Sequence, residues 1–117
     1  MSAHLDLGRT GEDAAATLYL KQGFRIVGRN WRRSEGELDL IAWRHGLVVF
    51  CEVKTRSSDY FGLPAEAVGF HKQRRLRRLA GRWLSENRSR GAAVRFDVVS
   101  VIVRNGRTEV TQIPNAF

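Results

Sequence analysis

Apolar and polar residues alternate along much of the chain, as they do in strands that bury one face. Alternating or strongly β-prone runs predict strands at 24–32, 36–44, 47–56 and 94–103, followed by a short edge strand at 108–113. His45-Gly46 and Asn105-Gly106 separate neighbouring runs. Both pairs predict tight hairpin turns, because Gly, Asn and to a lesser degree His accept positive φ angles.

Residues 10–22 predict a helix before the first strand. Thr10 is a suitable N-cap, and the acidic Glu12 and Asp13 would then lie in the first turn, where the helix dipole favours negative charge. Gly23 suits the position just beyond the helix end, where a left-handed conformation is common.

Residues 64–86 predict a second, longer helix with Pro64 near its first turn. Its apolar residues have the spacing of one buried helix face: Leu76, Leu79, Ala80, Trp83 and Leu84. Much of the remaining surface is basic, with Lys72, Arg74, Arg75, Arg78 and Arg82. This basic face is either an ordinary solvated surface or a contact for a phosphate backbone.

The predicted order of elements is α-β-β-β-α-β-β, which favours an α/β sandwich around a mixed central sheet. The 117 residues suit one domain, 1–117, with a core over about residues 8–113.

The chain is strongly basic, with a net charge of +8 and a pI of about 11.0. Such a charge favours polyanionic partners, nucleic acid first. Cys51 is the single cysteine, so an internal disulfide is excluded and a reducing compartment is favoured. Neither a signal peptide nor the ~20 apolar residues of a membrane helix is found. We therefore expect a cytoplasmic protein with no membrane role.

Four ionisable residues interrupt the apolar hairpin 36–56: Glu37, Asp39, Glu52 and Lys54. A two-residue turn at His45-Gly46 would pair Asp39 with Glu52 and Glu37 with Lys54, all on one face. The opposite face, which would include Leu38 and Leu40, is apolar beyond the turn. This pattern is either a solvated polar face or a site that needs its charges.

Directly opposed residues of an antiparallel pair have Cβ atoms about 4.5–5.5 Å apart. Asp39 and Glu52 would then be adjacent carboxylates, which repel each other and are costly to desolvate. A divalent cation removes both problems, and oxygen ligands suit Mg²⁺ or Mn²⁺. Lys54 lies within reach of the same point. The pattern therefore predicts metal-assisted phosphodiester cleavage.

Four blocks of sequence carry a family resemblance. They are GRTGE (8–12), GELDLIA (36–42), FCEVKTR (50–56) and RFDVV (95–99). In this order they resemble the YraN-like family of small, uncharacterised bacterial proteins. That family is described as predicted endonucleases of the PD-(D/E)xK superfamily, related to archaeal Holliday-junction resolvases. The resemblance covers roughly residues 8 to 103 and implies a restriction-endonuclease-like fold.

The resemblance also implies roles for individual residues. Asp39, Glu52 and the carbonyl of Val53 would bind the metal, and Lys54 would be catalytic. Apart from the resemblance, the predicted register places Glu37 opposite Lys54, where it would pair with Lys54 or approach the metal as a further catalytic residue. Glu12 matches a glutamate on the first helix of resolvases, although stabilisation of the helix dipole would explain it equally well.

We therefore expect a Mg²⁺- or Mn²⁺-dependent nuclease acting on DNA, with branched or structured DNA as candidate substrates. The alternative is a basic nucleic-acid-binding protein that keeps the fold without turnover. A protein-interaction module with incidental charge is a third possibility. A homodimer is compatible with the sequence, which identifies no two-fold surface. Asp97 would either support the site or satisfy buried backbone groups.

Overall fold

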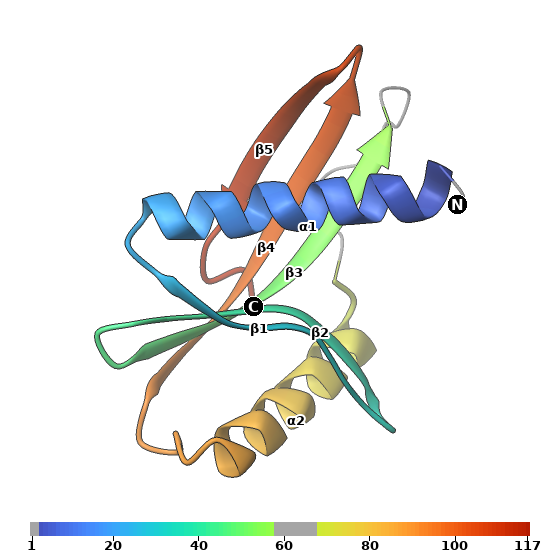
Figure 1. The fold of residues 1–117 in the computed structure, drawn as a ribbon. Helices are drawn as coiled ribbons and strands as arrows, with labels where there is room; N and C mark the ends of the chain where they lie inside the picture. Colours follow the sequence, from blue (N-terminus) through green and yellow to red (C-terminus); the bar gives the residue numbers. More distant parts are fainter. Residues whose placement is uncertain (1–2, 58–67) are drawn as a thin grey trace.

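The computed structural model describes residues 3–57 and 68–117 of the chain. Two helices and five strands follow in the order predicted from the sequence. They are α1 (Ala3–Lys21), β1 (Arg25–Arg33), β2 (Gly36–Arg44), β3 (Leu47–Ser57), α2 (Phe70–Glu86), β4 (Ala93–Arg104) and β5 (Arg107–Ile113) (Figure 1).

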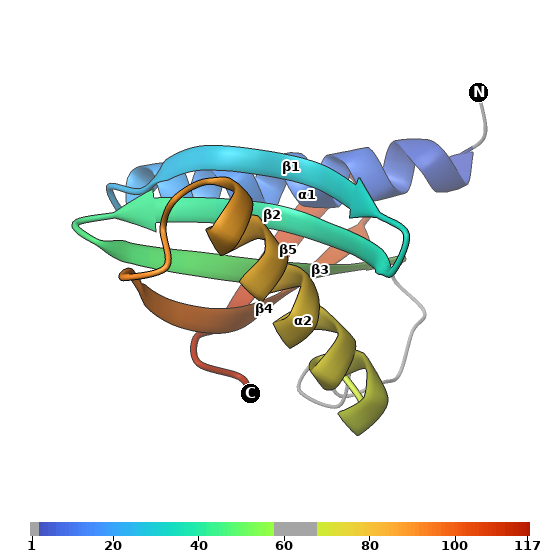
Figure 2. The same ribbon diagram turned by 90° about the horizontal axis from the view of Figure 1, so that it is seen from below.

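All five strands form one mixed sheet in the order β1-β2-β3-β4-β5. The first three strands are an antiparallel meander, β4 runs parallel to β3, and β5 is antiparallel to β4. The parallel pair needs a crossover, which contains α2. The two helices cover opposite faces of the sheet, with α2 lying diagonally across one face and α1 behind the other (Figure 2). The predicted α/β fold with a mixed sheet is therefore confirmed.

Each helix packs on its own hydrophobic core. On the α1 side, Ala15 and Tyr19 pack with Leu40, Val49 and Cys51. On the α2 side, the predicted apolar stripe of the helix packs on the other face of the same strands: Leu76, Leu79, Ala80 and Trp83, with Leu84 at the margin. Val48 and Phe50 alternate with Val49 and Cys51 between the two cores, as the period of a strand requires.

The two predicted hairpin turns are confirmed. His45 and Gly46 have φ angles of 48° and 78°, and Asn105 and Gly106 have 50° and 76°. These paired positive angles belong to the turn whose twist matches the flanking strands.

The predicted start of the first helix is wrong. The helix α1 begins at Ala3, so Thr10 is not its N-cap and Glu12 lies in the middle of the helix. Residues 3–9 continue the helix because no Pro interrupts them. Gly23, with φ +88°, follows the helix end as expected. Stabilisation of a helix dipole therefore does not explain Glu12, since that effect fades beyond the first turn.

The second helix begins later than predicted. Gly69 is extended, with φ −74° and ψ 168°, and α2 starts at Phe70. The helical prediction is therefore wrong at residues 68–69. The predicted first turn with Pro64 lies outside the described residues.

Buried Asp97 forms hydrogen bonds that connect several elements. Its carboxylate accepts hydrogen bonds from the Tyr19 hydroxyl (2.6 Å), two Arg95 nitrogens (both 2.9 Å) and the Asn115 amide (2.9 Å). It is fully buried, and its donors come from α1, β4 and the C-terminal segment. Asp97 thus holds α1 and the C-terminal segment against β4. Most of its donors are side chains, and the only backbone donor among these four bonds is the N–H of exposed Asn115, so neither of the two predicted roles describes it fully.

Candidate active site

The strands β2 and β3 separate where the hairpin carries its charges. The predicted register is confirmed from Arg44–Leu47 at the turn to Leu40–Cys51, where the ladder ends. Beyond this last pair, the backbone N–H of Val53, two residues after Cys51, donates to Oδ2 of Asp39 at 2.9 Å. A side-chain carboxylate thus takes the place of the next ladder partner. The predicted pairs Asp39–Glu52 and Glu37–Lys54 therefore do not form.

The strands also lose their regular alternation at this point. Leu38 packs on the α2 side, whereas Leu40 packs on the α1 side together with Ala42, and Ile41 returns to the α2 side. On the neighbouring β1, Asn30 has a φ of 51°, which breaks the regular strand conformation. The prediction that Leu38 shares a face with Leu40 is wrong. Asp39, between Leu38 and Leu40, lies beside Glu12 of α1.

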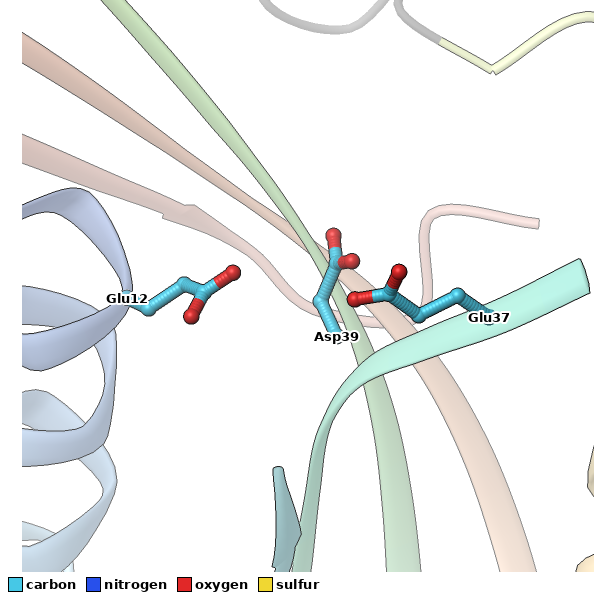
Figure 3. A group of neighbouring side chains, drawn as sticks. All are labelled: Glu12, Glu37 and Asp39. Atoms are coloured by element: carbon cyan, nitrogen blue, oxygen red, sulfur yellow. The ribbon is translucent and has the colours of Figure 1, made fainter. Parts of the chain in front are cut away.

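Three carboxylates meet on the α1 side of this opening. Glu12 of α1 and Glu37 and Asp39 of β2 offer oxygen atoms that all lie within 4.8 Å of one another. Glu12 and Glu37 point toward Asp39 from opposite sides (Figure 3). Glu37 is also paired with Arg32 at 2.9 Å, and Glu12 accepts a hydrogen bond from the side-chain amide of Asn30 at 3.0 Å.

Asp39 is the most electrostatically perturbed carboxylate of this group. Its pKa is raised to about 7, mainly by burial and further by the negative charges of Glu52, Glu37 and Glu12, against the lowering effect of the Val53 N–H. Both causes act by disfavouring the ionised form. The site therefore holds a carboxylate whose charge is poorly compensated by the described residues around it.

A second charged group lies toward α2. Glu52 is only 8% exposed, and its Oε1 is 2.7 Å from the ammonium of Lys72 on α2. Burial lowers the pKa of Lys54, and the nearby positive charge of Lys72 lowers it further, while Glu52 opposes this. Lys54 and Lys72 thus lie side by side at one nearly buried glutamate.

The prediction of a single charged face is wrong, because Asp39 turns toward α1 and Glu52 toward α2. The two residues nevertheless adjoin through the opening between the strands. An open pocket of about 300 Å³ is lined by Glu12, Asp39, Glu52 and Val53. It also borders Leu7, Gly8 and Thr55, so α1 forms one of its walls.

Close packing of α1 on β3 places Glu12 at the site. A Cβ atom at buried Gly11 would overlap the side chain of Thr55, so only glycine allows this approach. Glu12 was predicted from the sequence as a site residue, whereas Gly11, Thr55 and Asn30 were not. The available signal for Asn30 was its residue type, since asparagine is depleted in strands and tolerates positive φ.

The chemistry of this donor set fits a hard divalent cation. Asp39, Glu12 and Glu37 supply only oxygen atoms, and the raised pKa of Asp39 reflects anionic charge that a cation would offset. Glu52 lines the same pocket, although Lys72 pairs with it in this structure.

The basic residues predicted on α2 fall into separate environments. Lys72 turns toward Glu52, and Arg82 pairs with Glu35 at 2.8 Å and with Glu86 at 2.9 Å. The remaining three, Arg74, Arg75 and Arg78, line an open hollow together with His71.

Fold and site together define a small mixed α/β protein with a carboxylate-rich pocket where two strands separate. Residues 11–101 match the model of the uncharacterised protein family UPF0102, and the chain belongs to this family. It is 46% identical to a UPF0102 protein of Rhodococcus opacus (strain B4) and 48% identical to one of Frankia casuarinae, with both chains of each pair fully covered. A UPF0102 protein of Myxococcus xanthus is 45% identical over 96% of this chain and 89% of its own. The resemblance to a family of small uncharacterised proteins is thereby confirmed.

Neither α1 nor α2 has the length and apolar character that crossing a membrane requires.

Proposed function

We propose that this protein is a metal-dependent nuclease that hydrolyses phosphodiester bonds in DNA, with branched or structured DNA as candidate substrates. The observation that carries the proposal is the convergence of Glu12, Glu37 and Asp39 at a pocket that Glu52 and Val53 also line. The relation of the predicted motif to PD-(D/E)xK nucleases supports the same reaction class.

Mg²⁺ or Mn²⁺ would be held by Asp39 together with Glu12, Glu37, Glu52 or the carbonyl of Val53. A bound divalent cation supplies Lewis-acid stabilisation of a phosphoryl oxygen and a more acidic water. The carboxylates contribute the anionic oxygen donors and fix their positions from two separate elements, α1 and β2. Fixing donors on regular elements limits the reorganisation that the reaction requires.

Lys54 supplies positive charge on the other side of the opening. It is partly buried beside Glu52 and Lys72, so its ammonium acts in a medium less polar than bulk water. In this position it stabilises negative charge that develops on the phosphoryl group or the attacking water. The basic residues of α2 supply attraction for the polyanion, which is not specific for base sequence.

The test is cleavage of a panel of linear, flapped and four-way DNA substrates in Mg²⁺ and in Mn²⁺. The wild-type protein should cut at least one substrate in a metal-dependent reaction, and Asp39→Asn should abolish cutting. Glu109→Gln is the matched control, because it removes one carboxylate from the exposed part of β5. Equal cleavage by Asp39→Asn and wild type would overturn the site, and complete inactivity of the wild type would overturn the proposed reaction.

A second candidate is a basic nucleic-acid-binding protein without turnover. The ion pair between Lys72 and Glu52 favours it, since this pair neutralises one predicted metal ligand from within the chain. Metal-independent DNA binding without cleavage of any substrate in the panel would support this candidate.

A further inference from the structure

The basic face of α2 divides into engaged and open cations. Arg82 forms ion pairs with two glutamates, and Arg77 lies over the rings of Phe96 and Phe117 at 4.9 Å and 5.6 Å. Lys72 is held by Glu52. These three side chains already stabilise the fold or complete the acidic site, so they are poorly placed to bind a further anion.

The other basic residues surround an open hollow of about 290 Å³, and Arg74 among them lies over the exposed ring of Phe70 at 5.8 Å. Its lining residues are His71, Arg74, Arg75 and Arg78, all exposed. Within residues 3–57 and 68–117, no carboxylate forms an ion pair with these three arginines. Three neighbouring guanidinium groups repel one another, and an anion placed among them removes that repulsion.

The start of α2 adds to this positive field. Gly69 provides no side-chain cap, and the first turn contains no acidic residue. The N–H groups of a first turn carry partial positive charge and bind anions. His71 lies in this turn and lines the hollow, so the hollow lies at the positive end of the helix.

Two residues of α2 connect the helix that carries the hollow to strands that carry the acidic pocket. Lys72, next to His71, holds Glu52, which anchors the first turn of α2 at the pocket. Arg75 passes over Gly36, where a Cβ atom would lie 3.5 Å from Arg75 Cδ. Gly36 directly precedes Glu37, so Arg75 lies near the backbone that carries one of the three carboxylates.

We infer that His71, Arg74, Arg75 and Arg78 bind a phosphate group of the DNA backbone other than the one that is cleaved. This inference rests on the proposed nuclease function, because the acidic pocket defines where the cleaved phosphate lies. Guanidinium groups bind phosphate oxygens through paired N–H donors. Such contacts fix the position of the duplex without reading its sequence. Arg82 and Lys72, although basic and on the same helix, do not belong to this site.

The experiment measures binding of a short labelled DNA duplex over a range of salt concentrations in the presence of a chelator, which prevents cleavage. Each variant loses one positive charge from α2: Arg74→Gln, Arg78→Gln and, as the matched control, Arg82→Gln. Arg74→Gln and Arg78→Gln should each reduce the slope of log K against log salt by about one, the value expected for one lost phosphate contact. Arg82→Gln should leave the slope unchanged, because its charge is engaged by Glu35 and Glu86. Thermal unfolding of each variant verifies that it is folded.

Equal slopes for Arg78→Gln and Arg82→Gln would overturn the hollow as a specific site and leave the nuclease proposal intact. If the slopes fall in Arg74→Gln and Arg78→Gln but the wild-type protein cleaves no substrate, the hollow is supported as a phosphate-binding site and the proposed nuclease function is overturned. Calorimetric titration with inorganic phosphate then tests whether the hollow binds free phosphate instead of the DNA backbone. Saturation by free phosphate that leaves DNA binding unchanged would overturn the assignment to the DNA backbone.

Discussion

The ammonium of Lys72 on α2 lies 2.7 Å from the carboxylate of Glu52 on β3. Glu52 is nearly buried, and a buried carboxylate is costly unless a cation lies nearby. Lys72 supplies this cation from within the chain. If a divalent ion binds in the pocket, as proposed, the ammonium of Lys72 would compete with it for this carboxylate.

Lys72→Met should raise the affinity for Mn²⁺, because it removes this competitor. In a chelator the same variant should lose about 1–3 kcal/mol of stability, since Glu52 loses a charged hydrogen-bond partner. Calorimetric Mn²⁺ titration and urea unfolding measure the two effects. Lys21→Met at the end of α1 is the control, because it also exchanges an exposed lysine for methionine away from the site. Unchanged Mn²⁺ affinity in Lys72→Met would show that the two cations do not compete.

Asp39→Asn should stabilise the metal-free protein at alkaline pH. The pKa of Asp39 is about 7 in the folded protein against an ordinary value of 3.8, so the folded state binds the proton more tightly than the unfolded chain. In the wild type, the protonated Asp39 therefore makes its full contribution to the free energy of unfolding below about pH 4. This contribution is lost as the pH rises through 7. The complete shift corresponds to at most about 4 kcal/mol.

Urea unfolding of wild type and Asp39→Asn in a chelator, between pH 4 and pH 8, measures the difference. The stability gain should grow with pH and reverse in the presence of Mn²⁺, which stabilises only the wild type. A gain that is the same at both ends of the pH range would contradict the perturbed titration of Asp39.

Lys54→Met should lower cleavage while metal and DNA binding persist. The variant keeps the volume of the side chain and deletes its charge. A loss of about 10²–10³ in rate would match removal of one preorganised electrostatic stabiliser. Single-turnover cleavage beside Mn²⁺ titration separates this result from that of Asp39→Asn, which should weaken metal binding itself. Full activity in Lys54→Met would assign Lys54 to charge neutralisation only.

Asn30→Gly should weaken Mn²⁺ binding by about 10-fold, the lower range for loss of a group that orients a metal ligand. Asn30 donates to Glu12 at 3.0 Å from a backbone with positive φ, and glycine keeps that backbone while deleting the donor. Asn105→Gly makes the same change at a positive φ of 50° in the distant hairpin turn. If both variants bind Mn²⁺ like the wild type, Asn30 does not position Glu12.

Gly11→Ala should destabilise the protein by about 1–3 kcal/mol, because the new methyl group would overlap Thr55. Displacement of α1 should also move Glu12 and reduce Mn²⁺ affinity. Gly8→Ala, on the same helix, has no neighbour within 4 Å of its added Cβ. It should stabilise the protein by up to about 1 kcal/mol through helix propensity. Thermal unfolding of the two variants gives the comparison, and equal stabilities would contradict the close packing.

The sequence by itself determined the elements that depend on local pattern. Residue alternation and paired turn residues predicted the hairpin from Arg44–Leu47 to Leu40–Cys51, and its register is confirmed, because a two-residue turn fixes the pairing next to it. The apolar stripe of α2 was likewise readable, since helical spacing identifies the buried face. The start of α1 was not, because Thr10 suits a cap as well as it suits a helix interior.

Only the tertiary structure decided how the charged residues are arranged. Extrapolation of the register assumed unbroken alternation, whereas Leu38 and Leu40 lie on opposite faces of the sheet and Asp39 between them lies beside Glu12 of α1. The partnership of Lys72 with Glu52 depends on where α2 lies across the sheet. Such contacts join residues far apart in sequence, and they result from packing of whole elements, which no local pattern encodes.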